Sequence, residues 1–143
     1  MNTGTVWIID SDADDRDMVR EVWEELQLEN ELQFIGGAEE ALYRLTNAED
    51  APFIIICELY LPRINGFELR RRMLTAPSSK FRSVPFIFWS TNVSDQQINN
   101  AYELYAHGFF IKENRFEELK NTFNCILNYW LKSKTPSKKL KSY

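Results

Sequence analysis

The chain has 143 residues, of which 44% are hydrophobic and 14% aromatic, enough apolar material for the core of one globular domain rather than a disordered segment. No apolar run approaches the roughly 18 residues of a membrane span, and the first strand-like run follows Met1 too closely for a signal peptide. The net charge is −4, but residues 132–143 hold five lysines and no acid, so the remaining 131 residues carry −9. An acidic body argues against a nucleic-acid partner, because nucleic-acid binding depends on cationic contacts to phosphate.

The C-terminal residues and the two cysteines indicate the extent of the domain and its cellular compartment. Residues 132–143 are expected to form a basic, disordered tail, which leaves residues 1–131 as the domain. Cys57 and Cys125 follow neither a disulfide pattern nor a metal-knuckle pattern. A reducing cytoplasm is therefore the expected compartment.

Strand-like and helix-like patterns alternate through the domain. Short apolar runs of strand length occupy residues 5–9, 31–35, 53–57, 84–89 and 109–111. Apolar residues at helical spacing follow each run, within residues 18–26, 41–45, 67–74, 98–105 and 116–130. Five β-α units with short connections predict an α/β fold with a five-stranded parallel doubly wound sheet. It is expected to be flavodoxin-like, with strand order 2-1-3-4-5 and five helices.

Short sequence patterns predict where some helices begin and which of their residues face solvent. Ser94 with Gln97 and Asn114 with Glu117 have the spacing of capping boxes that open the last two helices. The arginine run 70–72 is expected on the solvated face and end of the third helix.

Polar residues follow four of the five predicted strands. They are Asp10, Ser11 and Asp12 after the first, Glu58 after the third, Ser90 and Thr91 after the fourth, and Lys112 after the fifth. In doubly wound sheets, ligands bind beyond the carboxyl ends of the strands. Carboxylates there can hold Mg²⁺ or attack phosphorus, and a hydroxyl and a lysine can bind phosphoryl oxygens. The sequence therefore predicts a phosphoryl-accepting pocket.

Four segments, in this order and at this spacing, resemble the receiver domain of two-component response regulators. They are VWIID at 6–10, LPRING at 61–66, VPFIFWST at 84–91 and GFFIK at 108–112. The resemblance extends from about Thr3 to Leu131. It implies that Glu58 occupies the phosphoacceptor position, with Ser90 as the switch hydroxyl, Phe109 as the aromatic switch residue and Lys112 as the lysine of the pocket.

The resemblance also exposes three departures at this pocket. The acceptor of the family is aspartate, whereas Glu58 is one methylene longer, and the second acid, a direct Mg²⁺ ligand, is Ser11 here. Asp10 matches the first acid, so Asp10 and Glu58 remain as weak metal candidates. The proline after the lysine is replaced by Glu113, so the preceding bond is expected to be trans. Because angstrom-scale misplacement can cost about 10²-fold in rate, we expect weak Mg²⁺ binding and little or no phosphorylation.

The expected function is that of a single-domain atypical receiver in phosphorelay signalling, acting through protein–protein contacts and not as an enzyme. Asp12 is expected to cap the first helix rather than to ligate metal. Glu58 can imitate a phosphorylated acceptor in part, with a charge of −1 against about −1.5 to −2 for a phosphoryl group. The resemblance implies that a histidine kinase or a downstream signalling protein docks on the fourth helix, fifth strand and fifth helix of a monomer or homodimer.

Two alternatives stay open. The first is a conventional phosphoryl-accepting receiver despite the substitutions. The second is a haloacid-dehalogenase-type phosphohydrolase, because Asp10-Ser11-Asp12 after a strand resembles the D-x-D motif of that class, in which the first Asp is the nucleophile and the second the acid/base. Against it, Asp14 stands where that motif prefers Thr or Val.

Overall fold

The computed structural model describes residues 4–47, 50–76 and 81–136. Five strands and five helices alternate along the chain. They are β1 (Val6–Ile9), α1 (Ala13–Leu26), β2 (Leu32–Ile35), α2 (Ala38–Asn47), β3 (Ile54–Cys57), α3 (Gly66–Thr75), β4 (Phe86–Ser90), α4 (Asp95–Glu103), β5 (Gly108–Ile111) and α5 (Phe116–Lys132). All strand pairs are parallel, in the order β2-β1-β3-β4-β5. The predicted flavodoxin-like α/β fold is confirmed.

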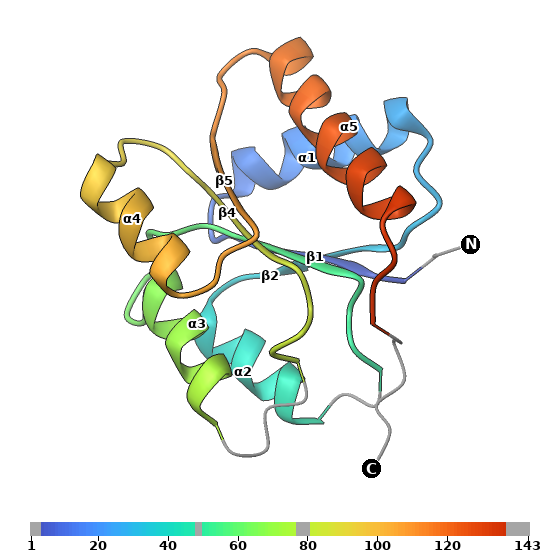
Figure 1. Cartoon of the computed structure of the whole chain (residues 1–143). Helices are drawn as coiled ribbons and strands as arrows, with labels where there is room; N and C mark the ends of the chain where they lie inside the picture. Colours follow the sequence, from blue (N-terminus) through green and yellow to red (C-terminus); the bar gives the residue numbers. More distant parts are fainter. Residues whose placement is uncertain (1–3, 48–49, 77–80, 137–143) are drawn as a thin grey trace.

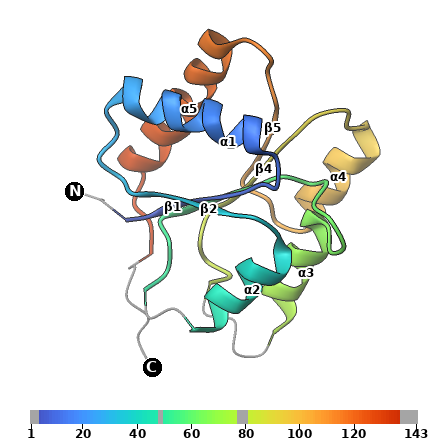
Figure 2. The ribbon, with the colours of Figure 1, turned by 180° about the vertical axis from the view of Figure 1, so that it is seen from behind.

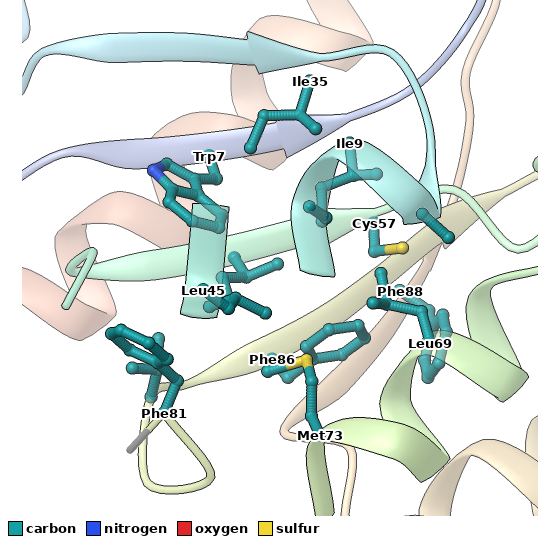
Figure 3. Packing of buried hydrophobic residues seen from close by; sticks show 14 of the residues in the cluster. Trp7, Ile9, Ile35, Leu45, Cys57, Leu69, Met73, Phe81, Phe86 and Phe88 are labelled. Carbon is teal, nitrogen blue, oxygen red and sulfur yellow. The ribbon is translucent and has the colours of Figure 1, made fainter. Parts of the chain in front are cut away.

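Helices cover both faces of the sheet (Figure 1 and Figure 2). Because side chains alternate along a strand, Val6 and Ile8 of β1 pack under α1 and α5, whereas Trp7 and Ile9 pack under α2, α3 and α4. Figure 3 shows the second of these clusters, in which Cys57 of β3 lies between Ile9 of β1 and Phe88 of β4. All residues of β1, β3 and β4 are buried, as expected for central strands of a sheet covered on both sides.

The expected tail is only partly described. Helix α5 continues to Lys132, and residues 137–143 lie outside the described residues. Within residues 4–47, 50–76 and 81–136, no helix has the length and apolar character needed to cross a membrane.

Two of the three expected helix caps are present. The Asp12 side chain accepts a hydrogen bond from the Asp15 amide and caps α1, and Ser94 with Gln97 forms the capping box of α4. The expectation for Asn114 is wrong, because α5 begins at Phe116 and Arg115 occupies the cap position without a side-chain hydrogen bond. The helix therefore starts one residue later than a cap at Asn114 requires.

Arg70 contradicts the expectation that the arginine run is solvated. It is 1% exposed, because residues 66, 69, 70 and 73 form the buried face of α3. Its Nε donates to the carbonyl of Leu104 at 2.9 Å and its Nη2 to the carbonyl of Tyr105 at 3.1 Å. The guanidinium also lies 4.9 Å from the ring centroid of Phe86, and burial lowers its pKa to about 10. Arg70 therefore connects α3 to the end of α4.

Replacing Arg70 with alanine tests this connection. We expect Arg70→Ala to lower the free energy of unfolding by about 2–4 kcal/mol, because two carbonyls lose their donor and the core loses a large side chain. Urea denaturation is the measurement, with Arg71→Ala as the matched control, since Arg71 binds Glu68 in an exposed ion pair at the surface. Equal effects of the two substitutions would contradict the assigned role.

Candidate functional site

The carboxyl ends of β1, β3, β4 and β5 meet at one edge of the sheet and form a polar pocket of about 390 Å³. Six of the residues predicted for the site line it: Asp10, Ser11, Asp12, Glu58, Thr91 and Lys112. Ser90, the last residue of β4, is fully buried behind them. The structure therefore brings together residues from four strands, as the sequence predicted.

The backbone around Glu58 is closely packed. Its amide donates to the carbonyl of Ile9 at 2.9 Å, which joins the ends of β1 and β3. Gly66 lies against the Glu58 carbonyl, and a Cβ at position 66 would be 2.6 Å from that oxygen. The amide of Gly66 also donates to the carbonyl of Leu59 at 2.8 Å. Only glycine allows this close approach, so the loop from β3 to α3 holds Glu58 in a defined place.

Both carboxylate oxygens of Glu58 accept hydrogen bonds from the protein. Oε2 accepts a short hydrogen bond from Ser90 Oγ and a second from the Tyr60 amide at 3.0 Å. Oε1 accepts from Lys112 Nζ at 2.6 Å. The side chain is 9% exposed. Glu58 therefore contacts both the hydroxyl and the lysine predicted to bind phosphoryl oxygens.

The ammonium of Lys112 binds three carboxylates. Its Nζ lies 2.7 Å from Asp10 Oδ2, 2.6 Å from Asp15 Oδ2 and 2.6 Å from Glu58 Oε1. It also lies 4.7 Å from the ring centroid of Trp89, within the range of a cation–π interaction. An ammonium has three N–H donors, so these carboxylates use all of them.

Two residues of the site, Asp15 and Trp89, were not predicted from the sequence. Asp15 comes from the first turn of α1, and its amide is bound by the capping side chain of Asp12 at 3.0 Å. Asp15 is the third residue after the cap Asp12 and therefore lies in the first turn of α1, next to Asp10. This spacing from the expected cap could have predicted Asp15 as a residue of the site. Trp89 precedes Ser90 on β4, where alternation directs it towards α1 and α5.

The buried charges shift one another's titration. Burial raises the pKa of Asp10 from 3.8 to about 6, against the lowering effect of its hydrogen bond with Lys112. Burial alone would lower the pKa of Lys112, but its hydrogen bonds to Asp10, Asp15 and Glu58 raise it above the ordinary 10.5. The three carboxylates therefore keep Lys112 charged, while burial makes Asp10 easier to protonate than an exposed aspartate.

The remaining predicted residues lie around this centre. Ser11 is exposed and Thr91 is half-buried. The Phe109 ring stacks on Phe88, with centroids 5.7 Å apart, in the core beneath α2, α3 and α4. The peptide bond between Lys112 and Glu113 is trans, as expected. Among the described residues, no group of three or more His, Cys, Asp or Glu side chains is arranged to hold a metal ion.

Comparison with known proteins agrees with this geometry. The model of the response regulator receiver domain family matches residues 6–124. The chain belongs to the response regulator receiver family.

Among curated relatives, the probable methanogenesis regulatory protein FilR2 of Methanothrix harundinacea (strain 6Ac) is 31% identical over 80 residues, which are 56% of this chain and 50% of that protein. The matched receiver segment therefore spans about half the length of that relative.

Solved receivers share the fold at low sequence identity. The phosphorylated cyanobacterial phytochrome response regulator RcpA superposes with a TM-score of 0.84 at 20% identity, covering 95% of this chain and all of RcpA. The Mn²⁺-bound response regulator Rcp1 superposes with a TM-score of 0.82 at 19% identity, covering 94% of this chain and 99% of Rcp1. As a receiver, the chain belongs to a class of two-component signalling modules that interact with partner proteins.

The raised pKa of Asp10 predicts a pH dependence of this receiver's stability. Between about pH 4 and 6, the folded state holds a proton on Asp10 that the unfolded state has released, so the contribution of Asp10 to stability falls as pH rises. We expect the free energy of unfolding of the wild type to fall by about 2–3 kcal/mol relative to the Asp10→Asn variant between pH 4 and pH 7. Urea denaturation of both proteins across this range is the measurement. A relative gain in wild-type stability with rising pH would show a lowered pKa instead.

Proposed function

We propose that this receiver signals through protein contacts from one conformation that Glu58 maintains, with phosphorylation impaired or absent. The observation that carries the proposal is the carboxylate of Glu58, which binds Ser90 Oγ and Lys112 Nζ at the same time. In the family resemblance, these two groups bind the phosphoryl oxygens of a modified acceptor. Glu58 therefore supplies, within the unmodified chain, contacts that otherwise require phosphorylation.

The same contacts argue against Glu58 as a nucleophile. Attack on phosphorus needs a carboxylate oxygen that can approach in line with the leaving group, and both oxygens of Glu58 are held in place by donors from three residues. Displacement by the length of a methylene adds to this cost. RcpA was crystallised in a phosphorylated form and Rcp1 with Mn²⁺, whereas this chain has Ser11 in place of the second acid of the metal site.

Tyr60 connects the Glu58 carboxylate to α4. Its amide donates to Glu58 Oε2, and its hydroxyl donates to the carbonyl of Asn92 at 2.9 Å and accepts from Gln97 Nε2 at 3.0 Å. Gln97 in turn accepts from the Ser94 amide within the capping box that opens α4. Glu58 therefore contacts the segment between β4 and α4 at both ends. It binds Ser90 directly at the end of β4, and it reaches Gln97 in the first turn of α4 through Tyr60. This connection supports a fixed position of the first turn of α4.

The surface formed by α4, β5 and α5 has the exposed side chains expected of a site that binds a protein partner. Four large side chains on it are well exposed: Tyr102, Tyr105, Ile111 and Tyr129. Aromatic side chains are enriched at protein interfaces. The partner we propose is a histidine kinase or a downstream signalling protein of the cytoplasm, bound by a monomer or homodimer of this chain.

Phosphorylation is tested by incubating the wild type with Mg²⁺ and acetyl phosphate and measuring intact mass. We expect no labile phosphoryl adduct on the wild type, because its acceptor is displaced and engaged. The Glu58→Asp/Ser11→Asp double variant, which restores the acceptor and the second acid, is expected to gain an adduct.

The outcomes separate the candidate functions. A labile adduct on the wild type that Glu58→Gln abolishes would make the chain a conventional receiver. Turnover of phosphate esters that depends on Asp10 and Asp12 would favour the phosphohydrolase.

The connection through Tyr60 is tested by removing one hydroxyl. We expect Tyr60→Phe to increase amide hydrogen exchange in residues 94–98 by roughly 3- to 10-fold, since a net hydrogen bond contributes about 0.5–1.5 kcal/mol. Mass spectrometry of exchanged peptides is the measurement, and Tyr43→Phe on the exposed surface of α2 is the matched control. Unchanged exchange in these residues would remove Tyr60 from the connection.

A further inference from the structure

The pocket contains a cation that belongs to the chain. Lys112 Nζ lies within 2.7 Å of one oxygen each from Asp10, Asp15 and Glu58. The Lys112 side chain is 9% exposed, and those of Asp10 and Glu58 are 2% and 9% exposed. Its stem is fixed at the end of β5, where the Lys112 amide donates to the Ser90 carbonyl at 2.8 Å. The ammonium is thus enclosed by carboxylates from three different elements.

The two carboxylates expected to ligate metal have no uncommitted oxygen. Asp10 Oδ1 accepts from the Asp12 amide at 2.9 Å, and its Oδ2 accepts from Lys112. Glu58 Oε1 also accepts from Lys112, and its Oε2 accepts from Ser90 and from the Tyr60 amide. A metal ion entering this pocket would have to break contacts with protein donors.

Further features oppose a divalent ion. Ser11 offers a neutral hydroxyl where a third acidic ligand is expected, although hard cations prefer carboxylate oxygens. A metal among these carboxylates would also have to compete with the ammonium of Lys112, which already binds all three. The residues present do not fit the Mg²⁺ site that the family implies.

We propose that Lys112 is the resident cation of this pocket and takes the place of a divalent metal. The inference rests on the proposed function and extends it to regulation: the conformation that Glu58 maintains is independent of Mg²⁺. As the pocket stands, the described residues form no group of carboxylates arranged to hold a metal ion. If the ammonium is removed, the charges of Asp10, Asp15 and Glu58 are no longer neutralised, and we expect their oxygens, the ligand type that hard divalent cations take, to rearrange around a metal ion.

The test compares divalent-ion binding by the full-length wild type, Lys112→Met and Lys112→Arg. Free Mn²⁺ is measured by electron paramagnetic resonance during titration. We expect Lys112→Met to bind Mn²⁺ at least about tenfold more tightly than the wild type, which corresponds to about 1.4 kcal/mol. Lys112→Arg, which keeps the positive charge, is expected to bind as weakly as the wild type. In Lys112→Met/Asp15→Asn, loss of one carboxylate is expected to reverse most of the gain.

Thermal unfolding gives a second readout. With Mg²⁺ about tenfold above its Kd, the Tm of Lys112→Met is expected to rise by about 3–6 °C. The wild-type Tm is expected to stay unchanged, and NaCl at equal ionic strength controls for screening.

Equal Mn²⁺ affinities of the wild type and Lys112→Met would overturn the proposal. If Lys112→Met does not fold, Mn²⁺ binding by the wild type is compared with binding by Asp10→Asn. Saturable binding to the wild type that Asp10→Asn abolishes would overturn the proposal. Absence of such binding to the wild type would support it. The proposed function fails separately, through a phosphoryl adduct on the wild type. Mn²⁺ binding without an adduct overturns only the resident-cation proposal.

Discussion

The pocket depends on one ammonium group shared by three carboxylates. Lys112 binds Asp10, Asp15 and Glu58 at 2.6–2.7 Å, and without it the buried Asp10 and Glu58 and the half-buried Asp15 would be left as neighbouring like charges. Removing one partner from a buried ionic group typically costs about 3–5 kcal/mol. The parallel sheet makes the arrangement possible, because pairing of β4 with β5 sets Lys112 beside Ser90, and pairing of β1 with β3 sets Asp10 beside Glu58. The ion pairs that balance the charge of these carboxylates therefore also bring together the types of group, carboxylates and a lysine, that receivers use for phosphoryl transfer.

Under the proposed function, glutamate at the position that the family resemblance gives to the acceptor limits how far phosphorylation could change the state of the pocket. A switch needs an input that alters the free-energy difference between two states, and a change from 1:99 to 99:1 needs about 5.5 kcal/mol. In this chain the contacts with Ser90 and Lys112 exist before any modification, so under the proposed function a phosphodonor would add little to them. Under the proposed function, signal strength would follow the amount of protein and the availability of its partner.

The sequence predicted the fold and the strand-end residues because both depend on local patterns. Five apolar runs, each followed by helical spacing, predict a parallel doubly wound sheet, and parallel strands bring Asp10, Glu58 and Lys112 to one edge. It did not predict the contacts of Tyr60 or Arg70. Tyr60 meets Gln97 across 37 positions and Arg70 meets Leu104 across 34, and no spacing rule in one sequence records such distant partners. Periodicity would have placed Arg70 on the buried face of α3, but its charge suggested solvent.

These two unexpected contacts have a joint consequence for α4. Tyr60 binds the capping box at the start of the helix, and Arg70 binds the carbonyls of Leu104 and Tyr105 at its end. A helix held at both ends has little conformational freedom to lose when a partner binds, and that loss is a main cost of association. Tyr60 is itself bound to Glu58, so the contacts of the Lys112 pocket extend to the start of α4. Under the proposed function, the surface that binds a partner is therefore already ordered in the folded chain before the partner arrives.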